Sequence, residues 1–228
     1  MQRRAMLLGG ATGLLGAGGY LYWQGRGTTA METATDLLPF QPANAQEASG
    51  DLPEVVEMSK GNPDAAVTLI EYASFTCPHC RTFHENVYPQ LEADYIEPGL
   101  INFIYREVYF DRYGLWAGMV ARCGGPLRYF GIVDLIYANQ SEWTQGAPAE
   151  VAENLRRIGR TAGFSNEELD ACMTDAAMAE AMIATYEANT EVHAIPGTPA
   201  FVLNDELHGN MNYDDLRGLI DAELEAAG

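Results

Sequence analysis

The sequence FTCPHC, residues 75–80, sets two cysteines three positions apart at the junction of two different patterns. Before it, residues 66–75 read AVTLIEYASF, an apolar run typical of a buried strand. After it, apolar residues recur at helical spacing, which predicts a helix over residues 78–95 that stops at Pro98 and Gly99. We therefore expect Cys77 at the N-terminal end of a helix, where unpaired backbone N–H groups favour a thiolate.

The two cysteines suit redox chemistry at this position. Cys80 follows Cys77 by one helical turn, so their sulfurs can close into a disulfide, and Pro78 fits a first helical turn because it needs no N–H partner. His79 adds a hydrogen-bond donor or a positive charge close to the Cys77 sulfur. Stabilising that thiolate makes the disulfide easier to reduce and the protein a stronger oxidant. Two cysteines at this spacing are, on their own, a weak signal for a redox site, so the surrounding sequence has to support this interpretation.

The order of the remaining patterns indicates an α/β fold. A second strand is expected over 101–108 (INFIYREV), which makes a β-α-β unit with parallel strands. Only helical patterns follow until residue 192, with breaks at 124–126, 146–148 and 163–165. Two strands and a helix then end the chain, over 198–204, 206–208 and 213–226. This order fits a thioredoxin fold with a helical insertion domain between the β-α-β unit and a C-terminal β-β-α unit.

Domain boundaries follow from the same patterns. We expect residues 51–112 to form the first part of the core, 113–192 the helical insertion, and 193–228 the second part of the core. Within the last two parts, three residues have the positions of helix caps: Ser165 with Glu168 as a capping box, and Asn212.

The N-terminal region has the pattern of an export signal. Arg3 and Arg4 precede an uncharged apolar stretch over residues 5–23, so residues 1–27 are predicted to be a cleaved signal peptide or an N-terminal membrane anchor. A buried N-terminal helix is a third interpretation. Residues 28–50 are too polar to pack by themselves and are predicted to be a flexible linker. A periplasmic or other extracytoplasmic location follows, with residues 5–23 holding the protein in the inner membrane if they are not cleaved.

The composition narrows the class of partner. The 32 acidic residues against 13 basic ones give a net charge of -19, so phosphate backbones would repel the chain and nucleic acid is excluded as a partner. With 47% hydrophobic residues the chain can bury a core of ordinary size. Four cysteines are too few for a disulfide scaffold of this length, but they leave room for two pairs.

A second motif supports the first. The sequence IPGTPAF, residues 195–201, opens a predicted strand, and Pro199 is read as a cis proline or as a simple strand-entry residue. FTCPHC together with Gly197-Thr198-Pro199 resembles the DsbA-like branch of the thioredoxin superfamily, over about 175 residues from near Pro53 to the C-terminus. Glu71, six positions before Cys77, matches the acidic residue that such proteins hold beneath the active site.

The resemblance implies a role for each of these residues. In thiol-disulfide exchange, the Cys77 sulfur would attack a partner disulfide or be attacked by a partner thiolate, and Cys80 would resolve the mixed disulfide. Pro78 and His79 lie between them, and His79 would tune the pKa of the Cys77 thiolate. Glu71 would assist proton transfer; the alternative is that it pairs with a buried cation. Thr198 and Pro199 would hold the substrate chain through backbone contacts, and the helical insertion would cover the active-site end.

Cys123 and Cys172 both lie in the predicted insertion. An exported protein would bridge them, and the resemblance implies a structural disulfide of this kind in some members of the family. The alternatives are two buried free cysteines or a second redox pair.

A metal site is a further alternative for the first pair, because Cys77, Cys80 and His84 fall on one helical face. A fourth ligand, His193, could reach them only through the tertiary fold. We expect no metal and no diffusible cofactor.

Together these observations predict an exported thiol-disulfide oxidoreductase that donates the Cys77–Cys80 disulfide to reduced exported proteins. By resemblance, a membrane protein of the DsbB type would re-oxidise it, and it would act as a monomer. Two alternatives remain open. One is a disulfide isomerase or reductase of the same superfamily, and the other is a metal-binding or chaperone-like module that uses the Cys77/Cys80 cleft.

Overall fold

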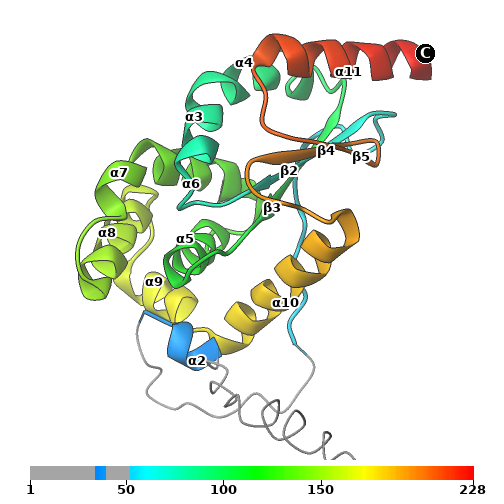
Figure 1. Ribbon diagram of the computed structural model, residues 1–228. Coiled ribbons are helices and arrows are strands. Elements are labelled where there is room, and N and C mark those ends of the chain that lie inside the picture. Colours follow the sequence, from blue (N-terminus) through cyan, green and yellow to red (C-terminus); the bar gives the residue numbers. More distant parts are fainter. Residues whose placement is uncertain (1–33, 40–51) are drawn as a thin grey trace, which may run out of the picture. The chain divides into compact units, whose positions relative to one another are not determined.

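The computed structural model of the chain describes residues 34–39 and 52–228 (Figure 1). The predicted signal or anchor and most of the predicted linker therefore lie outside the described residues. The short helix α2 (Ala34–Leu37) belongs to the first described segment. No helix in the two described segments is long and apolar enough to cross a membrane.

A sheet of five strands forms the centre of the described part. Its order is β1-β3-β2-β4-β5, where the strands are β1 (Met58–Gly61), β2 (Thr68–Ala73), β3 (Asn102–Glu107), β4 (Ala200–Leu203) and β5 (Glu206–His208). β2 and β3 are parallel, with Glu71 beside Tyr105, and the other pairs are antiparallel. The predicted fold class is confirmed, although three strands are shorter than expected and β1 was not expected at all.

Helices lie between β2 and β3, between β3 and β4, and after β5 (Figure 1). Between β2 and β3 lie α3 (Pro78–Asn86), α4 (Tyr88–Leu91) and the π-helical turn η1 (Glu92–Ile96). Between β3 and β4 lie α5 (Arg112–Arg122), α6 (Pro126–Ala138), α7 (Gln140–Trp143), α8 (Pro148–Thr161), α9 (Asn166–Met173) and α10 (Ala176–His193). Helix α11 (Tyr213–Ala227) ends the chain.

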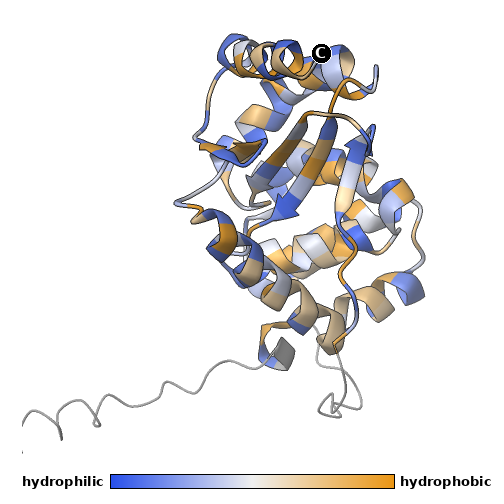
Figure 2. Cartoon of the chain, turned by 90° about the vertical axis from the view of Figure 1, so that its right-hand side faces the viewer, coloured by the Kyte–Doolittle hydropathy of each residue, from blue (hydrophilic) through white to orange (hydrophobic). Residues whose placement is uncertain are grey.

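The side chains of β2 alternate between two clusters, as the pleat of a strand requires. Leu69 and Ala73 pack into the large core that includes Cys80 and Phe83 of α3. Ile70 and Tyr72 pack on the opposite face, against which Tyr186 of α10 lies. Figure 2 shows hydrophobic residues on these central strands. Because Glu71 shares the side of Leu69 and Ala73, its carboxyl faces the helix that carries the two cysteines.

Helical structure covers the range predicted between β2 and β3, residues 78–95, but it is not one continuous helix. Helix α3 ends at Asn86, and a new turn begins at Tyr88. Pro89 explains the break, because it has no N–H to donate to the carbonyl of Glu85 and its ring would clash with that carbonyl. The chain then continues through the π-helical turn η1 toward β3.

The helices between β3 and β4 break where the sequence predicted and at two further places. Breaks at 124–126, 146–148 and 163–165 separate α5 from α6, α7 from α8, and α8 from α9; the additional breaks lie at Asn139 and at 174–175. The capping box is confirmed, since Ser165 N donates to Glu168 Oε2 and Glu168 N to Ser165 Oγ. The Asn212 cap of α11 is confirmed by the bond from Asp215 N.

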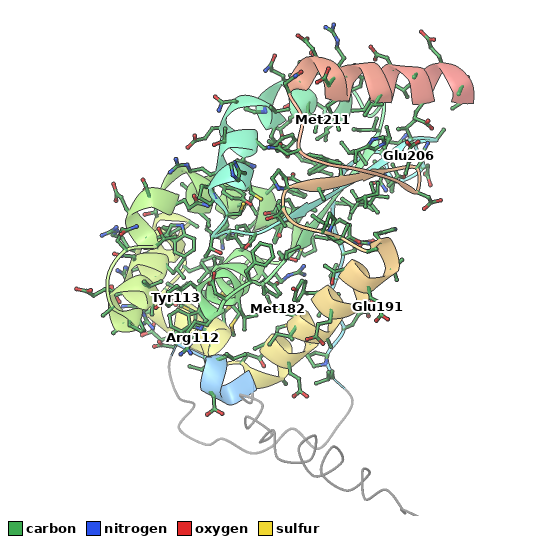
Figure 3. All side chains as sticks on the ribbon, viewed as in Figure 1. Arg112, Tyr113, Met182, Glu191, Glu206 and Met211 are labelled. Atoms are coloured by element: carbon green, nitrogen blue, oxygen red, sulfur yellow. A yellow bond between two sulfur atoms is a disulfide. The ribbon has the colours of Figure 1, made fainter. Side chains whose placement is uncertain are left out.

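Helices α5 and α10 share a small apolar cluster that is separate from the large core. Met182 of α10 points toward α5 (Figure 3) and is 1% exposed. There it packs with Leu115 and Met119 of α5 and with Leu38 from the first described segment.

Candidate active site

Cys77 is the N-cap residue of α3, and Pro78 occupies the first helical position. The backbone of Cys77 is extended, its N–H donates to the carbonyl of Ser74, and its carbonyl accepts the first helical bond from Arg81. Cys77 is partly exposed, whereas Cys80, one turn further, is fully buried. The predicted position of Cys77 at the start of the helix is confirmed. Both cysteines are free thiols in this structure.

The loop before β4 brings Thr198 and Pro199 to the same place. The peptide bond between them is cis, which resolves the two interpretations of Pro199 in favour of a cis proline. The Cys77 thiol donates to the carbonyl oxygen of Thr198 at 3.4 Å. Among the described residues, the buried Thr198 hydroxyl has no hydrogen-bond partner while Cys77 is a thiol, so it is free to donate to a thiolate.

This environment lowers the pKa of Cys77 from 9.0 to about 5. The largest cause is a hydrogen bond with the Cys80 thiol; the Thr198 side chain and the backbone N–H groups of Cys80 and His79 add to it, while burial opposes them. The helix terminus thus contributes as expected, but the neighbouring thiol contributes more. Burial raises the pKa of Cys80 far above its usual range. The site therefore favours Cys77 as a thiolate and Cys80 as a neutral thiol that donates a hydrogen bond.

Glu71 lies beneath this pair, and none of the described residues is a counter-ion to it. It is 1% exposed, and neither carboxylate oxygen has a hydrogen-bond partner within the described part of the chain. The alternative that it pairs with a buried cation is therefore wrong. Burial raises its pKa from 4.5 to about 8. Its charge also contributes to the raised pKa of Cys80, so the two groups are close enough to interact.

Residues 54–222 match the family model described as Thioredoxin. The chain belongs to the thioredoxin family. A Rickettsia bellii protein provisionally named a protein-disulfide oxidoreductase is 31% identical over 170 residues, which cover 74% of this chain and 65% of that protein. This chain therefore spans slightly less than two thirds of the length of that relative.

Two further comparisons place this thioredoxin-family chain in the DsbA-like branch. Disulfide bond formation protein D of Bacillus subtilis is 24% identical, with 72% of this chain and 76% of that protein covered. The crystal structure of Wolbachia pipientis alpha-DsbA1 is 25% identical with a TM-score of 0.71, and the match covers 77% of this chain and 94% of that one. The DsbA-like resemblance seen in the sequence is confirmed.

The histidines of this thioredoxin-family site do not gather around the cysteines. His84 Nε2 lies 2.8 Å from Asp134 Oδ1, and the imidazole stacks on Tyr88. His193 Nδ1 lies 2.6 Å from the hydroxyl of Tyr72. The described segments hold no group of three His, Cys, Asp or Glu side chains that could bind a metal ion. The alternative metal site therefore does not form in them. His79 is exposed beside Cys77, and its tuning role stays a prediction.

Several hydrogen bonds tie the active-site segment to the helices between β3 and β4. Gln140, the first residue of α7, is 3% exposed, and its Nε2 donates to the carbonyls of Phe75 at 2.7 Å and Cys77 at 3.0 Å. Thr76 Oγ1 donates to Asp111 Oδ2 at 2.9 Å. Gln140 was not among the predicted site residues, and no local signal in the sequence marks it, because its partners lie more than sixty positions away.

Cys123 and Cys172 form a disulfide, with their Cα atoms 5.7 Å apart. It joins the end of α5 to α9. The alternative of two free cysteines is therefore wrong. The bond lies within the helical region of the thioredoxin-family fold and does not include either cysteine of the first pair.

Proposed function

We propose that this DsbA-like protein is an exported thiol-disulfide oxidoreductase that acts as an oxidase, donating the Cys77–Cys80 disulfide to reduced substrate proteins. The observation that carries the proposal is the position of Cys77 at the N-cap of α3 with its pKa lowered to about 5. A sulfur with this pKa is a thiolate at neutral pH and a good leaving group. The stabilised thiolate favours the reduced pair, which makes the disulfide oxidising.

The first exchange takes place at Cys77, because Cys77 is partly exposed and Cys80 is buried. A substrate thiolate attacks Cys77 Sγ and forms a mixed disulfide, the bond between the two site sulfurs breaks, and its electron pair leaves on Cys80. Because burial raises the pKa of Cys80, this sulfur takes up a proton at once. Glu71, with a pKa of about 8, holds a proton at neutral pH and is the proposed donor.

The second exchange releases the product. A second thiolate of the substrate attacks the substrate sulfur of the mixed disulfide, and Cys77 leaves as a thiolate. The substrate dithiol has then lost two electrons and two protons. The electrons are on the site pair. Glu71 has given its proton to Cys80 and takes one of the two substrate protons back from solvent; the other stays in solvent because Cys77 stays ionised at neutral pH.

Substrate binding is proposed at the loop before β4. The Thr198 carbonyl lies beside Cys77 Sγ, and Pro199 follows it, so an extended substrate chain bound through its backbone at this loop would have its cysteine next to the reactive sulfur. His79 is the proposed tuning residue on the exposed side of Cys77. Such backbone recognition would suit many reduced exported proteins, because it does not depend on one side-chain sequence.

Turnover requires re-oxidation of the pair. We propose a membrane partner of the DsbB type that passes the two electrons to a quinone. The periplasm or another extracytoplasmic compartment is the proposed location, with residues 5–23 as signal or anchor, and the protein is proposed to work as a monomer. Residues 113–192 are proposed as the insertion domain that covers the active-site end.

The reduction potential tests the direction of the reaction. The purified protein is equilibrated with mixtures of reduced and oxidised glutathione, and the free thiols are counted by alkylation and mass measurement. We expect a value nearer to about -120 mV, as for DsbA, than to about -270 mV, as for thioredoxin. A value at or below the thioredoxin one contradicts the oxidase direction and favours a reductase. The variant Cys77→Ser, which should show no transition, assigns the signal to this pair and not to Cys123–Cys172.

A further inference from the structure

The turn that carries Cys77 has few bonds of its own. Between the end of β2 at Ala73 and the start of α3 at Pro78, the turn has one backbone bond of its own, from Cys77 N to the carbonyl of Ser74, and one bond between the hydroxyls of Ser74 and Thr76. The carbonyl of Phe75 in this turn is bound instead by the side chain of Gln140. The conformation that presents the Cys77 sulfur therefore depends on groups outside the turn.

Besides Asp111, which binds Thr76, three of those groups come from α6 and the start of α7. Asp134 and Tyr137 lie three residues apart on one face of α6, and Gln140 follows at the start of α7, beyond the break at Asn139. Asp134 pairs with His84 of α3, and Tyr137 donates to the carbonyl of Ser74. Each of the three side chains thus contacts the segment from the end of β2 to α3.

Gln140 makes the contact nearest to the reactive sulfur. Its amide donates to the Cys77 carbonyl at 3.0 Å and to the Phe75 carbonyl at 2.7 Å, and its side chain is almost fully buried. An amide N–H that binds the Cys77 carbonyl holds the backbone of the residue that carries the reactive sulfur. It also fixes the turn, so that the backbone N–H groups of α3 stay directed at that sulfur.

We propose that Gln140 is a positioning residue for thiol-disulfide exchange, which sets the reactivity of Cys77 by holding the Phe75–Cys77 turn from α7. It does not touch the substrate or the sulfur. The inference rests on the proposed function, since it concerns how the helical region adjusts the same redox site.

The test is the variant Gln140→Met, which keeps the length of the side chain and removes both donors. We expect the thiolate absorbance of the reduced variant to titrate at a pH higher by about half a unit or more, a change of about threefold in the ionisation constant of Cys77. The equilibrium constant with glutathione should change by a similar factor, toward a less oxidising disulfide.

The matched control is Trp143→Phe. Trp143 lies in the same short helix and is fully buried, and its Nε1 donates to the carbonyl of Ile136, within the helical region. We expect this variant to lose stability without a shift in the titration of Cys77. If Gln140→Met lowers the melting temperature like the control and leaves the Cys77 titration unchanged, Gln140 is only structural and the proposal is overturned.

A second measurement needs no variant to fold. In the wild-type protein, the side-chain amide resonances of Gln140 are followed by NMR as the reduced protein is titrated. We expect them to move with the midpoint of Cys77; amide resonances that stay constant through that midpoint contradict the proposal. A wild-type reduction potential in the thioredoxin range would reject the oxidase function. The difference in Cys77 titration between wild type and Gln140→Met would still be measurable, so failure of the proposed function and failure of the Gln140 proposal are distinguishable.

Discussion

The Sγ atom of Cys77 lies 3.4 Å from the carbonyl oxygen of Thr198, although 121 positions separate the two residues in the chain. The contact joins the start of α3 to the loop before β4, two segments that the helices between β3 and β4 keep apart in sequence. It puts the reactive sulfur beside the cis Thr198–Pro199 bond, where Cys77 stays partly exposed. In the proposed function, a substrate bound along this loop would therefore meet Cys77 and not Cys80.

The buried carboxyl of Glu71 should make the oxidised protein less stable as the pH rises. Its pKa is about 8 in the folded state and 4.5 in the unfolded chain, so the folded state keeps the proton longer and the free energy of unfolding falls between these two values. A shift of this size represents up to about 5 kcal/mol. In Glu71→Gln the decline should disappear, as measured by urea denaturation at a series of pH values. An equal slope in wild type and variant would show that Glu71 is ionised in the folded protein.

In the reduced protein, the contribution of Cys77 to stability should increase as the pH rises, which is opposite to the effect of Glu71. The pKa of this thiol is lowered from 9.0 to about 5 in the folded state, so the stabilisation that it gives is present in full above the unfolded value and is lost as the pH falls through the folded one. The disulfide form has no such thiol. We expect the difference in melting temperature between the reduced and oxidised forms to shrink from neutral pH toward about pH 5. A difference that stays constant or grows over this range is inconsistent with a stabilised thiolate.

Removal of the Cys80 thiol should weaken Cys77 as a leaving group. The hydrogen bond with Cys80 is the largest cause of the lowered pKa of Cys77, so Cys80→Ala should raise that pKa above about 5. The same variant cannot resolve a mixed disulfide, so adducts with a model thiol peptide should accumulate. Both effects are measured on one sample, by thiolate absorbance and by mass. The variant Cys80→Ser, which keeps a donor at this position, should show the smaller shift; equal shifts would show that the hydrogen bond is not the cause.

A buried ion pair at the end of β3 should be important for stability. Glu107 is 6% exposed and accepts hydrogen bonds from Arg122 Nε and from the hydroxyl of Tyr129, both at 2.8 Å. Glu107→Leu leaves the guanidinium buried without its carboxylate, and we expect a loss of about 3–5 kcal/mol by urea denaturation. Asp214→Asn, which removes an exposed pair with Arg217, should change stability by no more than about 1 kcal/mol. Similar losses in the two variants would contradict this account.

The parts of the site that depend on local sequence could be predicted. A cysteine followed by proline at the start of a helical pattern determines the cap of α3, and the capping box at Ser165 and Glu168 follows from two side chains three positions apart. The parallel pair of β2 and β3 follows from the helix between them. In each case the physical cause lies within a few residues, or within one β-α-β unit.

The parts that depend on tertiary contacts could not be predicted. Strand β1, Met58–Gly61, is a short edge strand whose sequence, MSKG, has no apolar alternation, so only its pairing with β3 makes it a strand. Gln140 reads as an ordinary polar residue in a helical region, and its role depends on the position of α7 beside the active-site turn. The contribution of Cys80 to the pKa of Cys77 depends likewise on the distance between the sulfurs, and the motif alone does not give that distance.

The central claim is that Cys77 is held as a thiolate at the start of α3. It is tested most directly by following the far-ultraviolet thiolate absorbance of the reduced protein against pH, with Cys77→Ala as the blank. The account predicts a single transition near pH 5 that is absent from the blank. A midpoint near the value of free cysteine, about 8.5, would contradict it.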